Sequence, residues 1–205
     1  MSSGNSLDCP SCGATLAVED RFTKVVICEY CGQTSALKNR SLDPTGKKVS
    51  LADVESEFRI GRKGTLKGES FTVLGRLRYD YEDGFWDEWF ISLEGGGKLW
   101  IQEDEGEITA YKKESITSQI PPWDEISVGS MVPINGAQVF VTEKNKASIT
   151  GGLGQLMFRI TPGEQIKYVD GNSGGELVSI EFSPEEINFS IGEALDTNDF
   201  TFSDQ

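Results

Sequence analysis

The sequence predicts a mainly β protein in which a small zinc ribbon precedes an antiparallel β-barrel or β-sandwich domain. Two observations lead to this fold class. All four cysteines lie near the start of the chain, in two Cys-x2-Cys pairs with a spacing typical of zinc ribbons. From Phe58 to about Gly192, short runs of alternating apolar and polar residues are separated by glycine-rich turns.

The cysteine pairs are Cys9 with Cys12 and Cys28 with Cys31. A two-residue gap lets one turn place both sulfurs of a pair on one metal ion. Four thiolates fill a tetrahedral site and leave no position for substrate, so we expect one structural Zn²⁺ within residues 9–38. Two disulfides, or an iron ion held by the same ligands, are the alternatives.

The other boundaries follow from composition. Pro44 and Gly46 break the polar segment after the ribbon, and Ser50 is suited to cap a short helix from Leu51 to Glu57. We therefore expect a loose tail at residues 1–8, a linker with a short helix at 39–57, an all-β domain at 58–192 and an acidic C-terminal tail at 193–205.

The first half of the β domain reads as a four-stranded meander. Residues 71–81 alternate with period two, and Gly75 interrupts the run where a β-bulge or a close backbone approach is expected. Three more runs end at about Lys113, and tight-turn sequences at residues 95–97 and 105–106 separate them.

Strand-like runs resume between Gln138 and Ile191, with separate strands expected at residues 138–142 and 147–150. A loose similarity links residues 88–93 to residues 176–180. Chance explains it as well as duplication does. If duplication is the cause, the domain is two related β-meanders that close on one core.

Charge and composition exclude several function classes. The formal net charge is −14, and residues 1–40 contribute none of it, so the β domain should repel nucleic acid. The simplest explanation of the charge is solubility. The chain has no histidine, which removes Ser-His-Asp and Cys-His catalysis, and no nucleophile has an evident base. We therefore expect a protein that is not an enzyme.

The expected location is the cytoplasm. No run approaches the roughly 18 apolar residues of a membrane span, so direct membrane insertion is not expected. Residues 1–8 also contain no apolar stretch of the signal-peptide type.

An acidic cluster around a glycine turn is a candidate cation site. Clustered carboxylates suit calcium, magnesium or a polyamine, although their spacing does not match an EF-hand loop. Exposed acidic hairpin tips are the alternative interpretation. The candidate residues are Asp80, Glu82, Asp83, Asp87 and Glu88.

Aromatic residues on strand faces expected to be polar are candidates for a protein interface. Trp89 and Ile91 share the expected core face, which leaves Phe90 on the opposite face, and Trp100 is placed in the same way on the next run. Packing under a second layer is the alternative. Trp123 after two prolines and Tyr30 in the ribbon complete the candidate interface.

One family resemblance stands out. The segment Gly64-Thr-Leu-Lys-Gly-Glu-x-Phe-x-Val-x-Gly-Arg-Leu-x-Tyr79, with Trp86-x-Glu-Trp89, resembles the bacterial domain of unknown function 4178. The later Gly163-Glu-x-Ile-x-Tyr-x-Asp170 is similar to the second half of that family, and Gln155 departs from it. The resemblance implies no established activity, and it implies a setting in envelope-stress or defence systems near polyamine-synthase-like enzymes.

Together these features favour a non-enzymatic adaptor in which a zinc ribbon and a β domain bind other proteins. The alternative is a module that binds a small ligand or cation, such as a polyamine or calcium, through the acidic hairpins.

Overall fold

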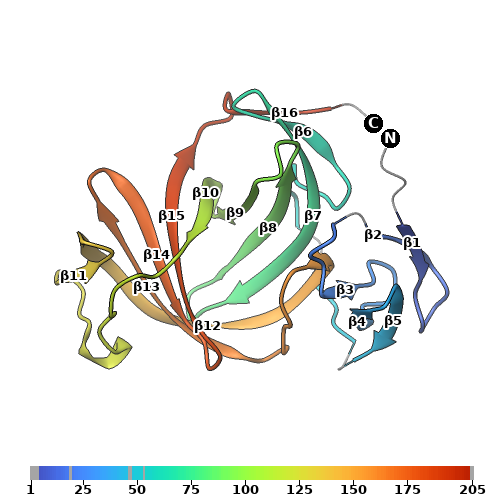
Figure 1. Cartoon of the computed structure of the whole chain (residues 1–205), viewed down its shortest axis with the longest axis horizontal. Helices are drawn as coiled ribbons and strands as arrows, with labels where there is room; N and C mark the ends of the chain where they lie inside the picture. The colour runs from blue at the N-terminus through green and yellow to red at the C-terminus, as the bar shows by residue number, and fades with distance from the viewer. Residues whose placement is uncertain (1–4, 19, 46–47, 53, 204–205) are drawn as a thin grey trace.

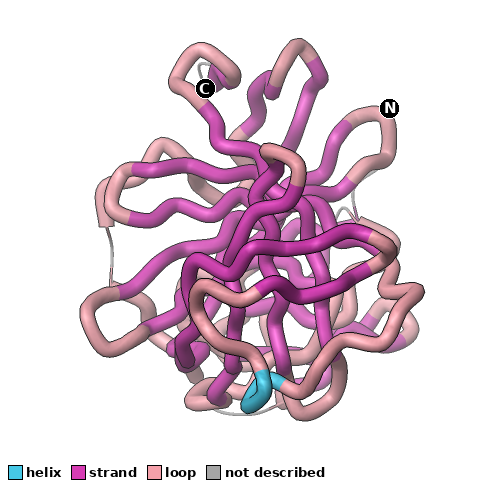
Figure 2. Tube along the Cα trace, turned by 90° about the vertical axis from the view of Figure 1, so that its left-hand side faces the viewer, coloured by secondary structure: helices cyan, strands magenta, loops and turns pink. Residues whose placement is uncertain are grey.

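The computed structural model describes residues 5–18, 20–45, 48–52 and 54–203. Within these residues the elements are β-strands, apart from the short 3-10 helix η1 (Trp123–Glu125). Figures 1 and 2 show the strands wrapped around a common centre, and Figure 1 places the N-terminal ribbon at one side of them. The predicted mainly β fold class is confirmed.

Eight strands form a closed antiparallel ring. In chain order they are β7 (Glu69–Asp80), β8 (Phe85–Leu93), β9 (Lys98–Asp104), β10 (Glu107–Glu114), β12 (Ala137–Leu156), β13 (Gln165–Ser173), β14 (Glu176–Phe182) and β15 (Ile187–Leu195). Strands β7–β10 form one meander and β12–β15 a second, joined by the pairings β10–β15 and β7–β12. The domain is therefore a barrel rather than a sandwich, and the first expected meander is confirmed (Figure 1).

The ring closes where two glycines meet. Gly154 of β12 lies opposite Gly75 of β7. A Cβ on Gly75 would lie 2.3 Å from the Gln155 carbonyl oxygen, and a Cβ on Gly154 would lie 2.4 Å from the Leu74 carbonyl oxygen. No side chain fits at such distances, so both residues must be glycine for the strands to pair. The close backbone approach expected at Gly75 is confirmed.

Strand β12 is longer than the sequence predicts. Its 20 residues include both runs that were expected to be separate strands, at 138–142 and 147–150. The strand pairs with β13 through its first half and with β7 through its second half, with a register shift in each ladder. These irregularities let one strand bend around the ring and pair with both β13 and β7.

Apolar side chains cover much of both faces of the ring. One outer cluster, with Val178 and Ile180, packs under the connector that holds η1 and β11 (Met131–Ile134). A second outer cluster, with Trp89, packs under β6 (Lys63–Leu66) and β16 (Phe200–Phe202). The inner cluster includes Leu77 and Tyr79.

Part of the ribbon belongs to the same sheet as the ring. Its first two strands, β1 (Asn5–Asp8) and β2 (Thr15–Val18), pair with each other. Strands β3 (Val25–Ile27), β4 (Thr34–Lys38) and β5 (Ser41–Pro44) extend the large sheet, because β3 pairs with β12. Val25 and Ile27 also join the inner apolar cluster of the ring. Three of the five ribbon strands thus share a sheet with the ring, so the ribbon and the ring are coupled through strand pairing.

Several expected boundaries change. Strand β1 occupies residues 5–8 of the expected tail, whereas residues 1–4 lie outside the described residues. Strand β5 occupies part of the expected linker, and the described residues of 51–57 are not helical. The acidic C-terminal tail contains β16, which pairs with β6. Its Phe200 and Phe202 pack against Phe58, so apolar burial decides the structure of this segment rather than its acidic composition.

Candidate functional site

The four cysteine sulfurs converge in the ribbon. Their Sγ atoms all lie within 4.8 Å of one another. The Sγ–Sγ distance is 3.7 Å both for Cys9 with Cys31 and for Cys12 with Cys28. A disulfide would require about 2.05 Å, whereas a tetrahedral site with metal–sulfur bonds of about 2.3 Å has edges of about 3.8 Å. The cluster therefore fits one tetrahedral metal ion, and the cysteines are free thiols rather than disulfides.

The protein supplies all four ligands and shields part of the cluster. Cys9 and Cys28 are buried against Leu16 and Val26, whereas Cys12 is exposed. Burial raises the pKa of the Cys28 thiol to about 12, so a bound cation is needed to keep it a thiolate at neutral pH. A metal ion held by all four sulfurs would have no open position for a substrate.

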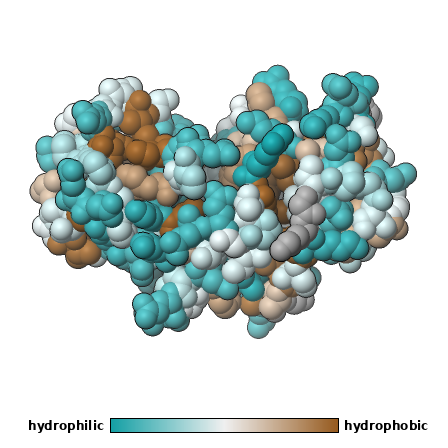
Figure 3. Space-filling view, turned by 90° about the horizontal axis from the view of Figure 1, so that it is seen from below, coloured by the Kyte–Doolittle hydropathy of each residue, from teal (hydrophilic) through white to brown (hydrophobic). Residues whose placement is uncertain are grey.

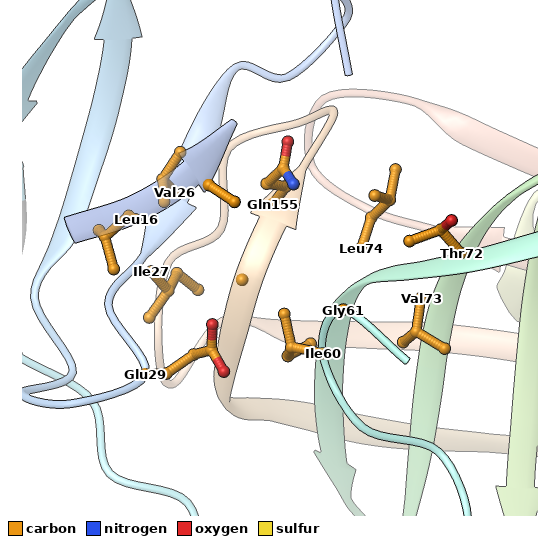
Figure 4. Close-up of a pocket in the computed structure, with 12 residues that line it drawn as sticks. Leu16, Val26, Ile27, Glu29, Ile60, Gly61, Thr72, Val73, Leu74 and Gln155 are labelled. Carbon is orange, nitrogen blue, oxygen red and sulfur yellow. The ribbon is translucent and has the colours of Figure 1, made fainter. Parts of the chain in front are cut away.

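A small cavity marks the seam between the ribbon and the ring. It has a volume of about 100 Å³, and Figure 4 shows Leu16 and Val26 of the ribbon across from Val73 of the ring. The buried Gln155 at this seam accepts hydrogen bonds from the Asp20 backbone N–H and the Thr23 hydroxyl. The departure from the family pattern at Gln155 thus has a structural role, which is to tie the ribbon to β12.

A second cavity, of about 150 Å³, lies inside the ring. Its walls come from β8, β9, β12, β13 and β14, so strands on opposite sides of the ring face each other across it. We call it the acidic cavity, because five of its ten lining residues are acidic and none is basic. The lining residues are Tyr81, Trp86, Glu88, Gln102, Asp104, Glu143, Tyr168, Asp170, Ser179 and Glu181.

Protein hydrogen bonds satisfy only part of this lining. Trp86 Nε1 donates to Glu88 at 3.2 Å, and the Tyr168 hydroxyl donates to Glu143. Among the residues that the structure describes, four buried side-chain oxygens lack a hydrogen-bond partner. Two of these belong to the acidic cavity, namely Asp104 Oδ1 and Asp170 Oδ1. Buried polar atoms are normally paired, so these two oxygens are candidate acceptors for a ligand.

Burial and mutual repulsion raise the pKa values of the cavity acids. Desolvation raises the pKa of Asp170 to about 7; Ser179 opposes the rise, and Glu143 and Glu181 add to it. Desolvation, followed by repulsion from Glu181, raises the pKa of Glu88 well above its usual value. The pKa values of Asp104 and Glu181 are raised as well, chiefly by burial. A cation placed among these groups would favour their ionised forms.

The five acids predicted as a cation site do not come together. Asp80, Glu82 and Asp83 are exposed, and Asp80 accepts a hydrogen bond from Thr150. Asp87 and Glu88 are adjacent on β8, so they face opposite sides of the sheet. Of the five, only Glu88 lines the acidic cavity. The prediction that acidic hairpin tips form one cation site is therefore wrong.

Asp87 belongs to a buried ion triad on the outer face of the ring. Its carboxylate accepts two hydrogen bonds from Arg76, at 3.0 and 2.7 Å, and two from Arg78, at the same distances. All three residues are at most 6% exposed. Arg76 also lies over Trp89, and Arg78 lies over Phe85. The two arginines thus balance the charge of Asp87 inside the sheet, and the triad is structural.

The four aromatic candidates for an interface also separate. Phe90 is only 1% exposed and its ring lies 4.9 Å from that of Trp100, so it belongs to the core and the prediction of an interface there is wrong. Trp100 is partly buried and contacts Phe158. Trp123 lies beneath Lys144, 3.9 Å from its Nζ. Tyr30 is 76% exposed and is the one of the four that is fully available to a partner.

The fold and the site define a class of protein: a four-cysteine ribbon joined to an eight-stranded ring with an acidic interior. The chain belongs to the family described as "Domain of unknown function (DUF4178)", whose model matches residues 59–197. No curated protein and no solved structure matches the chain. Within the described residues, no helix is long and apolar enough to cross a membrane.

Proposed function

We propose that the protein is a non-enzymatic binding protein whose ring takes up a small organic cation. The acidic cavity carries this proposal, because five carboxylates face it and no basic side chain lines it. Burying ionised carboxylates without counter-charges is costly. A cationic ligand removes that cost, and the unpaired oxygen of Asp170 is ready to accept a hydrogen bond from it.

A protonated amine fits this cavity better than a bare calcium ion does. Calcium needs six to eight oxygens at about 2.3–2.6 Å. Among the described residues, the cysteines alone form a group of three or more candidate ligands within 4.8 Å of one another. The volume of about 150 Å³ is roughly ten times the 10–15 Å³ that one water molecule needs by a similar measure. Tyr81, Trp86 and Tyr168 add aromatic rings, which attract ammonium groups.

The four-cysteine site holds Zn²⁺ in this proposal. The all-sulfur tetrahedral arrangement is the usual ligand set of structural zinc. Four cysteines at metal-ligand distances also favour a reducing compartment, and this supports a cytoplasmic location. The zinc stabilises the ribbon, and the ring binds the ligand.

The proposal predicts that amines stabilise the folded protein and that this effect depends on Asp170. One site filled at a hundred times its dissociation constant adds about 2.7 kcal/mol, which is a shift of roughly 5–10 °C for a chain of this size. Thermal melts with butylamine, putrescine and choline measure the shift. Asp170→Asn should remove it, and the exposed Asp83→Asn, which makes the same chemical change, should leave it intact.

The dependence on pH provides a second readout of the same experiment. A proton on Asp170 competes with the amine, so the shift should be larger at pH 8 than at pH 6. Without ligand, the raised pKa destabilises the folded state as pH rises through about 7. Asp170→Asn should therefore melt no lower than the wild type at pH 8. The proposal fails if no amine shifts the melt, or if Asp83→Asn removes the shift as well.

A protein-binding adaptor is a second candidate, and the exposure of the ribbon favours it. Tyr30 lies between two metal ligands and is 76% exposed, and Phe22 is 52% exposed. On the face shown in Figure 3, hydrophobic side chains gather in small patches among hydrophilic ones. Truncation of an aromatic hot spot at the centre of an interface costs about 2 kcal/mol or more. Tyr30→Ala should thus weaken the binding of a purified partner at least tenfold without changing the melting temperature, whereas equal binding would exclude this surface.

A further inference from the structure

The two unpaired carboxylate oxygens of the acidic cavity lie on opposite walls of the ring. Asp104 is on β9 and Asp170 is on β13. Around the closed ring, β10, β15 and β14 separate these strands on one side, and β8, β7 and β12 separate them on the other. Each oxygen exposes less than 1 Å² and has no hydrogen-bond partner. A ligand that satisfies both must reach across the interior.

The remaining acids are grouped around these two positions. Besides desolvation, repulsion from Glu143 and Glu181 raises the pKa of Asp170, and desolvation together with repulsion from Glu181 and Asp170 raises the pKa of Glu88. At Asp104, desolvation and repulsion from Glu105, Glu143 and Glu107, near the β9–β10 turn, raise the pKa. The cavity thus has one centre of negative charge on the β13–β14 side and another on the β9 side, and Glu143 acts on both.

The stretch between the two centres suits a hydrocarbon chain. Trp86, Tyr81 and Tyr168 line the same cavity. The Tyr81 ring lies 5.7 Å from the Trp86 ring, and Tyr168 meets Trp86 edge to face at 5.4 Å. Burial of methylene groups against such rings is favourable. A charged group in the middle of a ligand would lose its hydration there, which is unfavourable.

On the basis of the proposed function, we infer that the ligand is a linear α,ω-diamine or a longer polyamine. One ammonium group binds Asp170 and the other binds Asp104, and the aliphatic chain lies against Trp86. Two or three positive charges also match the acidic lining better than one does, because each ammonium group offsets part of the repulsion among five carboxylates.

Calorimetric titrations at fixed ionic strength test this inference on the full-length, metal-loaded protein. Putrescine is compared with butylamine, which has the same carbon chain and a single amine. We expect putrescine to bind at least tenfold more tightly. Asp104→Asn should weaken putrescine binding at least tenfold and change butylamine binding less than twofold, because the monoamine occupies only the Asp170 position. Asp83→Asn is the control and should change neither affinity.

The outcomes separate this inference from the function on which it rests. If butylamine and putrescine bind equally, or if Asp104→Asn affects neither, the ligand has one charged end and the two-ended inference is overturned while cation binding stands. Preferred binding of choline leads to the same conclusion. If no amine binds to the wild type, both the inference and the proposed function are overturned.

Discussion

Replacing Asp87 with asparagine is expected to destabilise the protein by about 3–5 kcal/mol, the usual cost of removing one partner from a buried ion pair. The carboxylate accepts four hydrogen bonds from Arg76 and Arg78. Without it, two buried guanidinium groups would repel each other with no counter-charge, and the amide nitrogen would add a donor where only acceptors are useful. The triad bridges β7 and β8, so its loss should weaken the first meander directly.

Denaturant unfolding of Asp87→Asn and Asp83→Asn measures this effect. The two substitutions make the same chemical change four residues apart, but Asp83 is exposed and should change stability by no more than about 0.5 kcal/mol. A loss of less than about 1 kcal/mol in Asp87→Asn would mean that the buried triad does not stabilise the fold in the way its geometry indicates.

Loss of the metal is expected to destabilise the ring as well as the ribbon. In isolated zinc-finger peptides, metal binding supplies roughly 10–16 kcal/mol of folding free energy. Here the ribbon strand β3 pairs with β12 and places Val25 and Ile27 in the inner cluster of the ring. Exposure of these two side chains alone would cost about 3–6 kcal/mol, or a fall in melting temperature of roughly 6–24 °C.

Cys28→Ser and treatment with a chelator both test this coupling. Elemental analysis should find one zinc ion per chain in the wild type and none in Cys28→Ser. Hydrogen exchange should then show loss of protection in β12 as well as in the ribbon. Ser6→Ala, also in the ribbon but not a metal ligand, is the control. If β12 keeps its protection after the metal is removed, the ribbon and the ring fold independently.

The sequence predicted the ribbon well because its information is local. Two Cys-x2-Cys pairs determine which sulfurs meet, and the four sulfurs do converge. The attachment of the ribbon to the ring depends instead on a long-range pairing, β3 with β12, which links residues more than a hundred positions apart. No local pattern in either strand identifies the other, and by composition alone the polar stretch after the ribbon is typical of a linker.

The meanders were predictable from the sequence, but which face of each strand points into the ring was not. Alternation along β8 correctly placed Trp89 and Ile91 on a buried face. That face is the outer one, because other strands cover the ring, whereas Glu88 faces the interior. The usual rule that the apolar face of a strand points inward therefore predicts an apolar interior, whereas the interior contains the acidic cavity. The similarity between residues 88–93 and 176–180 compares β8 with β14, which hold different positions in the two meanders.

The acidic cavity could not be assembled from the sequence, since its acids are far apart along the chain. Asp104, Glu143 and Asp170 belong to β9, β12 and β13. Each is the one acidic residue that its strand contributes to the cavity lining. The run of acids from Asp80 to Glu88 is the stronger local pattern, although neighbours on a strand point in opposite directions. Only closure of the ring brings the cavity acids together.

A crystal structure of the metal-loaded protein grown with saturating putrescine tests whether the ring binds a diamine at both ends. We expect density for one elongated molecule inside the ring, with one nitrogen within hydrogen-bond distance of Asp170 Oδ1 and the other within that distance of Asp104 Oδ1. Water alone in the cavity at a concentration of putrescine that saturates binding in solution, or putrescine bound on the outer surface, would contradict it.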